Sequence, residues 1–235
     1  MRIASLACGL AVSSCAYAAY PLITEDTATQ GVGGWQLEGT SEVATHRSGR
    51  VTLDNLVLNY GLQDSADLQL VLPWYSGDLR SEGDRQVNLK WRFFERGPFS
   101  MGVKPSLLLR GGDPEKGTGT GENNWAVTLM GGYQAGDLTL NADVLYQTNR
   151  NTSGARDSLS HVSAGVLYQL GPVQLVADFS REKPVDPAVD EAARYTLVGL
   201  IWAVHPDFGL GFGYKEGRGG TELKHSWLFG ASVRW

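Results

Sequence analysis

The sequence predicts an all-β protein, an antiparallel transmembrane β-barrel of the outer-membrane type with about twelve strands. Three observations predict this fold. Apolar and polar residues alternate, in segments of about ten residues, from Trp35 to the C-terminus. The connections between these segments alternate between short and long. Tryptophan and tyrosine gather near the ends of the segments, on their apolar face, where a bilayer interface holds amphipathic rings.

Twelve segments carry the alternation. The clearest is Val87–Phe93, in which every second residue is apolar and the intervening residues are Asn, Lys and Arg. A strand with two unlike faces suits a barrel wall that separates lipid from a polar interior. The predicted strands are 34–45, 50–60, 68–74, 87–93, 101–109, 125–133, 138–146, 162–168, 173–179, 194–204, 208–214 and 227–235.

The connections sort by length along the chain. The short ones are 63–65, 95–98, 134–137, 171–172 and 205–207, and the long polar ones are 76–84, 111–123, 147–158, 181–193 and 215–224. The connection near 46–49 is the exception: its place in the chain puts it on the rim of the long connections, but it is short. Short turns on one rim and long loops on the other are typical of outer-membrane barrels. Both termini are then expected on the periplasmic side.

Two features of the last strands support the barrel. Gly209, Gly211 and Gly213 alternate with apolar residues, so the polar face of this strand has no side chains, which relieves crowding in a barrel lumen. The chain ends on an alternating strand, Trp227–Trp235, with an aromatic C-terminal residue. This ending resembles the terminal signal that outer-membrane barrels present to the barrel assembly machinery, and we expect that machinery and outer-membrane lipid as partners.

Composition excludes two other classes. The 235 residues have a mean hydropathy of −0.19, and no apolar run of about 18 residues occurs beyond the extreme N-terminus, which excludes a helical transmembrane protein. The formal charge of −5 excludes a protein that binds nucleic acid without sequence preference, because such a protein needs clustered Lys and Arg.

The N-terminus reads as an export signal in residues 1–18. Arg2 begins it, an apolar stretch follows, and Ala16–Ala18 forms a small-x-small cleavage site. Cys15 permits an alternative, processing as a lipoprotein. Both cysteines, Cys8 and Cys15, lie in this segment, so no thiol is expected in the exported chain. Residues 19–33 are then either a periplasmic leader or a plug inside the lumen, and 34–235 form the barrel.

If the apolar faces contact lipid, the opposite faces line the lumen. The candidate lumen-lining residues are Glu38, Glu42, Arg50, Asp54, Asp67, Gln69, Lys90, Arg92, Lys104, Arg110, Asn141, Asp143 and Asp178. Buried charges of mixed sign need partners or water, so these residues indicate either a wet passage or a lumen filled by paired side chains. The remaining histidines lack metal-ligand spacing, and we expect no metal and no cofactor.

One pair could carry enzyme chemistry. His161 and Ser163 share a strand face, a spacing that resembles the outer-membrane phospholipase. A serine nucleophile needs an adjacent base and a group that orients the base, and no orienting residue is evident nearby. The expectation is therefore that the protein is not an enzyme, with lipid hydrolysis as the third alternative.

Several motifs resemble an outer-membrane family described as "putative meta-pathway of phenol degradation", a group of presumed transporters. The motifs are Pro21–Thr27, Thr29–Gly31, Trp35–Glu38, Tyr60–Leu62, Asp67–Leu70, Leu72–Trp74, Asn88–Phe93 and Lys104–Leu107. Beyond them the similarity rests on the barrel pattern. Arg110–Asp113 departs from the Pro-x-Gly-Asp of the family, which weakens the match in the third surface loop.

The resemblance implies passive passage of small, aromatic or hydrophobic compounds through a barrel in the bacterial outer membrane. A structural or binding barrel with an occluded lumen is the alternative. The expected ligand is a small-molecule solute, and no nucleic acid is expected.

Overall fold

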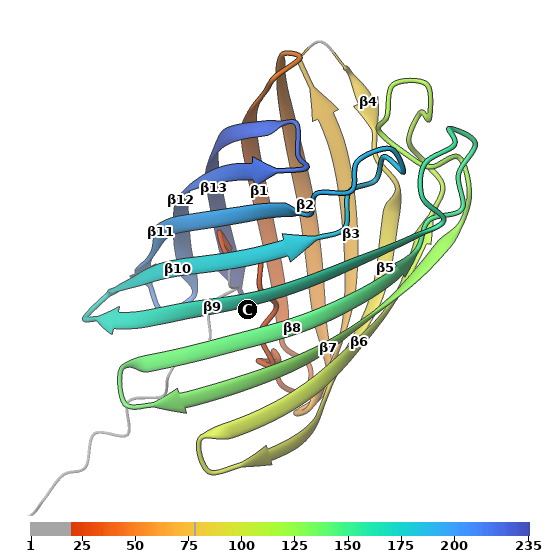
Figure 1. The fold of residues 1–235 in the computed structure, drawn as a ribbon. Coiled ribbons are helices and arrows are strands. Elements are labelled where there is room, and N and C mark those ends of the chain that lie inside the picture. The colour runs from red at the N-terminus through yellow and green to blue at the C-terminus, as the bar shows by residue number, and fades with distance from the viewer. Residues whose placement is uncertain (1–19, 78) are drawn as a thin grey trace, which may run out of the picture.

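The computed structural model describes residues 20–77 and 79–235, which form a closed antiparallel barrel (Figure 1). Its long strands are β1 (Trp35–His46), β2 (Arg50–Gln63), β3 (Ala66–Ser76), β5 (Arg85–Arg96), β6 (Phe99–Leu109), β7 (Asn124–Ala135), β8 (Leu138–Thr148), β9 (Ser158–Leu170), β10 (Val173–Glu182), β11 (Ala193–His205), β12 (Phe208–Gly219) and β13 (Leu223–Arg234). A short strand, β4 (Ser81–Glu82), pairs with the end of β3. The predicted export signal, 1–18, lies outside the described residues.

Every long strand pairs with its neighbours in the chain, and pairing of β1 with β13 closes the barrel. The predicted fold of about twelve antiparallel strands is confirmed. Within the described residues, no helix is long and apolar enough to span a bilayer.

The two faces of the wall differ as the alternation predicts. In β5, Leu89 and Trp91 point outward and are 41% and 47% exposed. Asn88, which precedes Leu89 and points inward, is 1% exposed. Aromatic rings pack against each other on the outer face, with centroids 5.7 Å apart for Trp125 and Tyr146 and 5.0 Å apart for Tyr214 and Trp227. A continuous apolar outer face with paired aromatic rings is suited to lipid.

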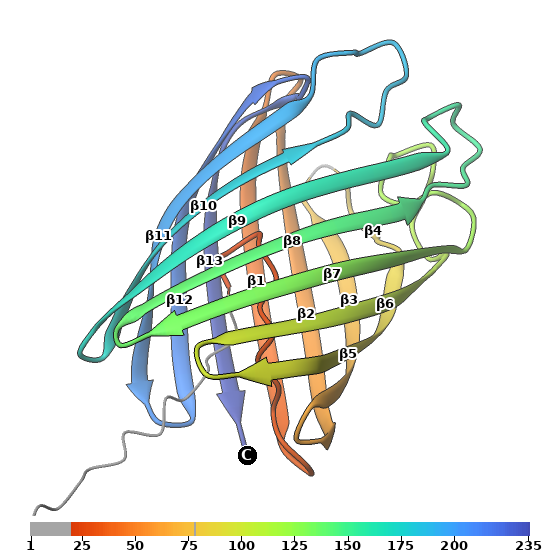
Figure 2. The same cartoon turned by 60° about the horizontal axis from the view of Figure 1, so that its bottom comes forward.

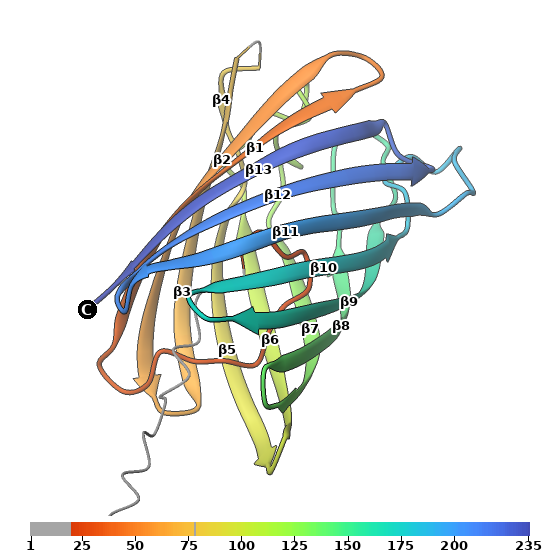
Figure 3. The same cartoon turned by 90° about the vertical axis from the view of Figure 1, so that its left-hand side faces the viewer.

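Short turns gather at one rim and longer connections at the other (Figures 2 and 3). The predicted long connection 215–224 is wrong, because β12 continues to Gly219 and β13 begins at Leu223. Pairing persists in this region, with Ala193 opposite Gly219. The reason is that strands can extend beyond the lipid belt, where the ladder continues but the outer face no longer needs apolar residues. Periodicity therefore underestimates strand length at this rim.

Asp84 holds the connection between β6 and β7 against the wall. Its Oδ1 accepts the N–H groups of Gly111 and Gly112 at 3.0 and 3.1 Å. Its Oδ2 accepts the N–H of Thr120 at 2.9 Å and the Thr120 hydroxyl at 3.1 Å. Hydrogen bonds to a carboxylate are stronger than neutral ones, so one side chain orders both halves of this loop.

Replacing Asp84 with alanine is therefore expected to free the 110–123 connection without unfolding the barrel. Loss of the carboxylate removes about 2 kcal/mol of local stabilisation, which makes protease cleavage within the loop about thirty-fold faster. Limited proteolysis of the folded protein measures this. Glu122→Ala, which removes a carboxylate from the loop itself, is the control, and equal cleavage of the two variants would contradict the role of Asp84.

Candidate functional site

Residues 20–33 are called here the N-terminal segment. Residues 20–30 lie inside the barrel, and the segment leaves the lumen at the rim, where Val32 is 70% exposed. The segment crosses the interior from the β11–β13 side to the start of β1 (Figure 3). Thr24 and Thr27 are 2% and 7% exposed, although they belong to no strand. The segment joins β1 beside Gly61, where Gly33 donates to the Gly61 carbonyl at 2.8 Å.

Three carboxylates of the wall bind the backbone of this segment. A backbone that crosses a lumen has no sheet partner, so its N–H groups need other acceptors. The contacts are from Ile23 and Thr24 N–H to Asp178 Oδ2 at 3.1 and 2.8 Å, from Glu25 N–H to Asp143 Oδ2 at 2.7 Å, and from Gln30 N–H to Asp67 at 3.0 and 3.1 Å. The wall thus supplies acceptors for four N–H groups of the segment, between Ile23 and Gln30.

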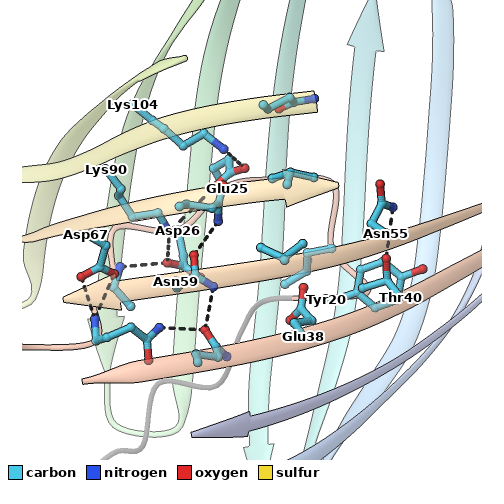
Figure 4. A pocket seen from close by; sticks show the side chains of 18 of the residues that line it. Tyr20, Glu25, Asp26, Glu38, Thr40, Asn55, Asn59, Asp67, Lys90 and Lys104 are labelled. Carbon is cyan, nitrogen blue, oxygen red and sulfur yellow. Dashed lines mark hydrogen bonds and ion pairs between the residues drawn. The ribbon is translucent and has the colours of Figure 1, made fainter. Parts of the chain in front are cut away.

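Two lysines of the wall bind the acidic side chains of the segment (Figure 4). Lys90 Nζ lies 3.1 Å from Asp26 Oδ1 and 3.8 Å from Glu25 Oε2. Lys104 donates a hydrogen bond to Glu25 Oε1. Burial on its own raises the pKa of Glu25, but Lys104 and Lys90 outweigh it and lower that pKa to about 2. Glu25 therefore stays ionised and bound to the lysines at neutral pH.

Glycines on the inner face make room for the start of the segment. A Cβ on Gly230 would lie 2.5 Å from Tyr20 Cδ1, and a Cβ on Gly213 would lie 2.9 Å from Pro21 Cβ. Both distances are shorter than van der Waals contact. The side-chain-free strand face predicted around Gly213 thus lies against Tyr20 and Pro21.

Gly230→Val is expected to displace Tyr20 and Pro21 from this face while the barrel stays closed. Over-packing of this kind costs about 1–3 kcal/mol. A segment that loses this contact becomes accessible to protease, which digestion of the purified protein followed by mass spectrometry measures. Gly39→Val is the control, because a Cβ at Gly39 meets no atom within 4 Å. An unchanged digestion pattern in Gly230→Val would contradict the packing described.

A cavity of about 280 Å³ lies between the segment and the β1–β5 wall (Figure 4). An amide ladder runs along this wall: Asn59 donates to Gln36 at 3.2 Å, Gln69 to Asn59 at 2.8 Å and Asn88 to Gln69 at 2.7 Å. A second cavity of about 300 Å³ lies on the β7–β10 side. The lumen is therefore polar and divided by the segment, and neither cavity is large.

The structure brings most of the predicted lumen residues together. The residues that line the first cavity are Glu38, Asp67, Gln69, Lys90 and Lys104, and Asp143 lines the second. Asn141 and Asp178 are buried on the inner face at 6% and 0% exposure. Glu42 pairs with Lys215 at 2.7 Å.

Four predicted residues lie elsewhere. Arg92 is near the short-turn rim and donates to the Asp64 carbonyl at 3.0 Å. Arg110 lies beyond the end of β6 and is exposed. Arg50 and Asp54 are on the outer face, one residue out of phase with Asn55, which lines the cavity. Near the loop rim the alternation of β2 is inverted: Val51 and Leu53 face the lumen, and Arg50 and Asp54 face outward. Outer residues beyond the lipid belt need not be apolar, so the sequence pattern predicts the wrong face there.

Sequence reasoning missed several inner-face residues. Gln36 is two residues before Glu38 and so shares its face, which period-2 counting could have found. Lys215 lies one residue beyond the predicted strand 208–214. Tyr195 lies inside the predicted strand 194–204, where an aromatic residue gives no sign of a polar inner face. Tyr195 donates to Glu182 Oε1 at 2.6 Å, so Glu182 also belongs to the lumen.

His161 and Ser163 do not form a nucleophile and base. Ser163 Oγ is buried and has no hydrogen-bond partner among the described residues. His161 instead lies between two carboxylates, 3.8 Å from Asp143 Oδ1 and 3.9 Å from Glu182 Oε2. A serine without contact to its base is not activated. Within the described residues, no three His, Cys, Asp or Glu side chains are arranged to hold a metal ion.

A closed barrel with a lipid-facing apolar belt and a polar lumen that contains cavities is the architecture of an outer-membrane channel. The chain belongs to the Gram-negative porin family, whose family model matches residues 58–234. The protein is therefore a porin-like barrel of the Gram-negative outer membrane. No curated protein sequence matches the chain.

Solved structures of channels share this fold. The COG4313 outer membrane channel from Pseudomonas putida F1 has a TM-score of 0.67 and 17% identity, over 89% of this chain and 98% of that one. The KdgM porin has a TM-score of 0.64 and 12% identity, over 84% and 98%. The NanC porin has a TM-score of 0.62 and 13% identity, over 85% and 98%. At these identities the likeness concerns the fold.

Proposed function

We propose that the protein is a passive channel for small solutes whose lumen the N-terminal segment narrows. One observation carries the proposal: side-chain contacts, and not a β-ladder, hold the segment across the interior. These contacts are the charges at Glu25 and Asp26 and the apolar packing of residues 20–23 against the wall. An element held by a few side chains can be displaced without loss of any barrel strand, whereas a strand of the wall cannot. The exported chain would begin after residue 18 and so carry the segment as its N-terminus.

The solute class that we propose is small aromatic or hydrophobic compounds. The resemblance of residues 21–107 to the phenol-pathway family supports this class, and the size of the cavities, about 280 and 300 Å³, supports solutes of one ring. We also propose that the barrel assembly machinery recognises the strand that ends at Trp235. The solute would contact inward-pointing side chains as it passes, namely those of Glu38, Asp67, Gln69, Lys90 and Lys104.

Solute entry into liposomes tests the channel. Vesicles with the purified barrel are expected to admit benzyl alcohol-sized solutes and small sugars faster than protein-free vesicles, and to show conductance in planar bilayers. The second candidate is a barrel with an occluded lumen. The contacts that bind the segment to strands on opposite sides of the barrel favour it. Silent bilayers together with unchanged solute entry would reject the channel and support the occluded barrel.

Charge on the inner face gives the channel a preferred ion. Carboxylates outnumber Lys and Arg among the residues that line the two cavities. A lumen with excess negative charge concentrates cations. Reversal potentials in a KCl gradient are therefore expected to show cation selectivity, and Glu38→Gln is expected to reduce it. A reversal potential of the opposite sign would contradict the assignment of these carboxylates to the passage.

A further inference from the structure

The second cavity has two unlike sides. It lies between the N-terminal segment and strands β7–β10, and its volume is about 300 Å³. Ile23, Leu145, Leu159 and Val185 supply an apolar side. The volume is roughly ten times the ~30 Å³ that one water occupies in the liquid, which is room for a molecule of one ring.

Two buried oxygens of the lining make no hydrogen bond to any described residue, although one of them lies 3.8 Å from His161 Nε2. They are Asp143 Oδ1 and Thr128 Oγ1, and their residues are 5% and 1% exposed. The other oxygen of Asp143, Oδ2, accepts the Glu25 N–H. Buried polar atoms are normally hydrogen-bonded, so this side of the cavity is suited to a group that donates hydrogen bonds.

Carboxylates outnumber lysines on the polar side, where Glu25, Asp143 and Glu182 stand against Lys104 and Lys183. Asp143 and Glu182 both line it, on either side of His161. The distances from His161 to the two carboxylates, 3.8 and 3.9 Å, exceed hydrogen-bond length. Of the two lysines in the lining, Lys104 is already bound to Glu25, and Lys183 is exposed. A donor that carries positive charge therefore suits this site better than a neutral or anionic one.

We propose that this cavity binds a small organic ammonium compound, with its charged nitrogen toward Asp143 and Glu182 and a single apolar ring against Ile23, Leu145, Leu159 and Val185. The site would select among the solutes that enter the lumen. The inference rests on the proposed function for its biological meaning only, because binding to the purified barrel is measurable without any flux.

Calorimetry on the detergent-purified, full-length exported chain tests the proposal with three probes of one shape. Benzylamine is expected to bind at pH 7 at least ten-fold more tightly than benzyl alcohol, and benzoate is expected not to bind. Equal affinity for all three probes, or no binding of benzylamine, would overturn the proposal. Flux in liposomes is measured separately, so a barrel that binds benzylamine and passes nothing would reject the channel and keep the site.

Two isosteric variants locate the site. Asp143→Asn keeps an oxygen to accept the Glu25 N–H but removes the charge, and it is expected to weaken benzylamine binding at least ten-fold. Asp178→Asn removes the same charge from a carboxylate that also holds the segment but does not line the cavity. It is expected to change the affinity by a much smaller factor. Equal losses in the two variants would place the binding elsewhere and overturn the assignment.

Discussion

Deletion of residues 20–30 is expected to raise the single-channel conductance several-fold. These residues cross the lumen and divide it into two cavities of about 280 and 300 Å³. A barrel of twelve strands is wider than the side-chain-filled eight-stranded barrels, so removal of the segment leaves a continuous aqueous lumen. Conductance in planar bilayers at fixed KCl concentration measures the change.

The deletion leaves every strand intact, since β1 begins at Trp35. Heat-modifiable migration on gels is the control for a folded barrel. A folded deletion variant with wild-type conductance would show that the segment does not limit the passage.

Replacing Lys90 and Lys104 together with methionine is expected to release the acidic middle of the segment, Glu25 and Asp26, from the wall, with a smaller effect than the deletion because residues 20–23 keep their apolar contacts. Their side chains are 13% and 10% exposed, so the two lysines neutralise Glu25 and Asp26 in a largely dry place. Removing one partner of a buried ion pair costs about 3–5 kcal/mol, because the remaining charge is left without compensation. Displacement of this acidic part of the segment relieves that cost, and conductance should rise part of the way toward that of the deletion.

A rescue separates this electrostatic effect from general damage. Adding Glu25→Gln and Asp26→Asn to the double lysine variant removes the uncompensated charges, so the segment is expected to return and conductance to fall again. A quadruple variant that still conducts like the double lysine variant would indicate that the lysine changes altered the wall itself.

The extent to which the sequence predicts this structure depends on whether lipid sets the pattern. In β5, lipid contact requires apolar residues at Leu89 and Trp91, so the inward direction of Lys90 follows from period-2 alternation. In β2, near the loop rim, Val51 and Leu53 face the lumen while Arg50 and Asp54 face outward, so the alternation predicts the wrong face. Outer-face residues of β12 beyond Tyr214 also lie outside the lipid belt and need not be apolar. The alternation therefore does not reveal that β12 extends to Gly219.

The site is harder to predict than the wall, because its contacts join residues far apart in the chain. Asp178 lies 155 positions from Ile23, and no periodicity links the two. The polar composition of residues 20–33 left both a plug and a leader open. The glycines at 209, 211 and 213 indicate an inner face without side chains. They do not indicate that Tyr20 and Pro21 fill that space.

A disulfide between the segment and the wall tests most directly whether the segment lies in the lumen. Thr27 Oγ1 and Ser100 Oγ lie 2.6 Å apart, so cysteines at both positions place two sulfurs within bonding reach. The only native cysteines are Cys8 and Cys15, in the predicted export signal. Thr27→Cys with Ser100→Cys is expected to oxidise nearly completely in the folded barrel and to keep the low conductance of the wild type. A folded barrel in which the two thiols stay reduced under oxidant would contradict the placement of the segment in the lumen.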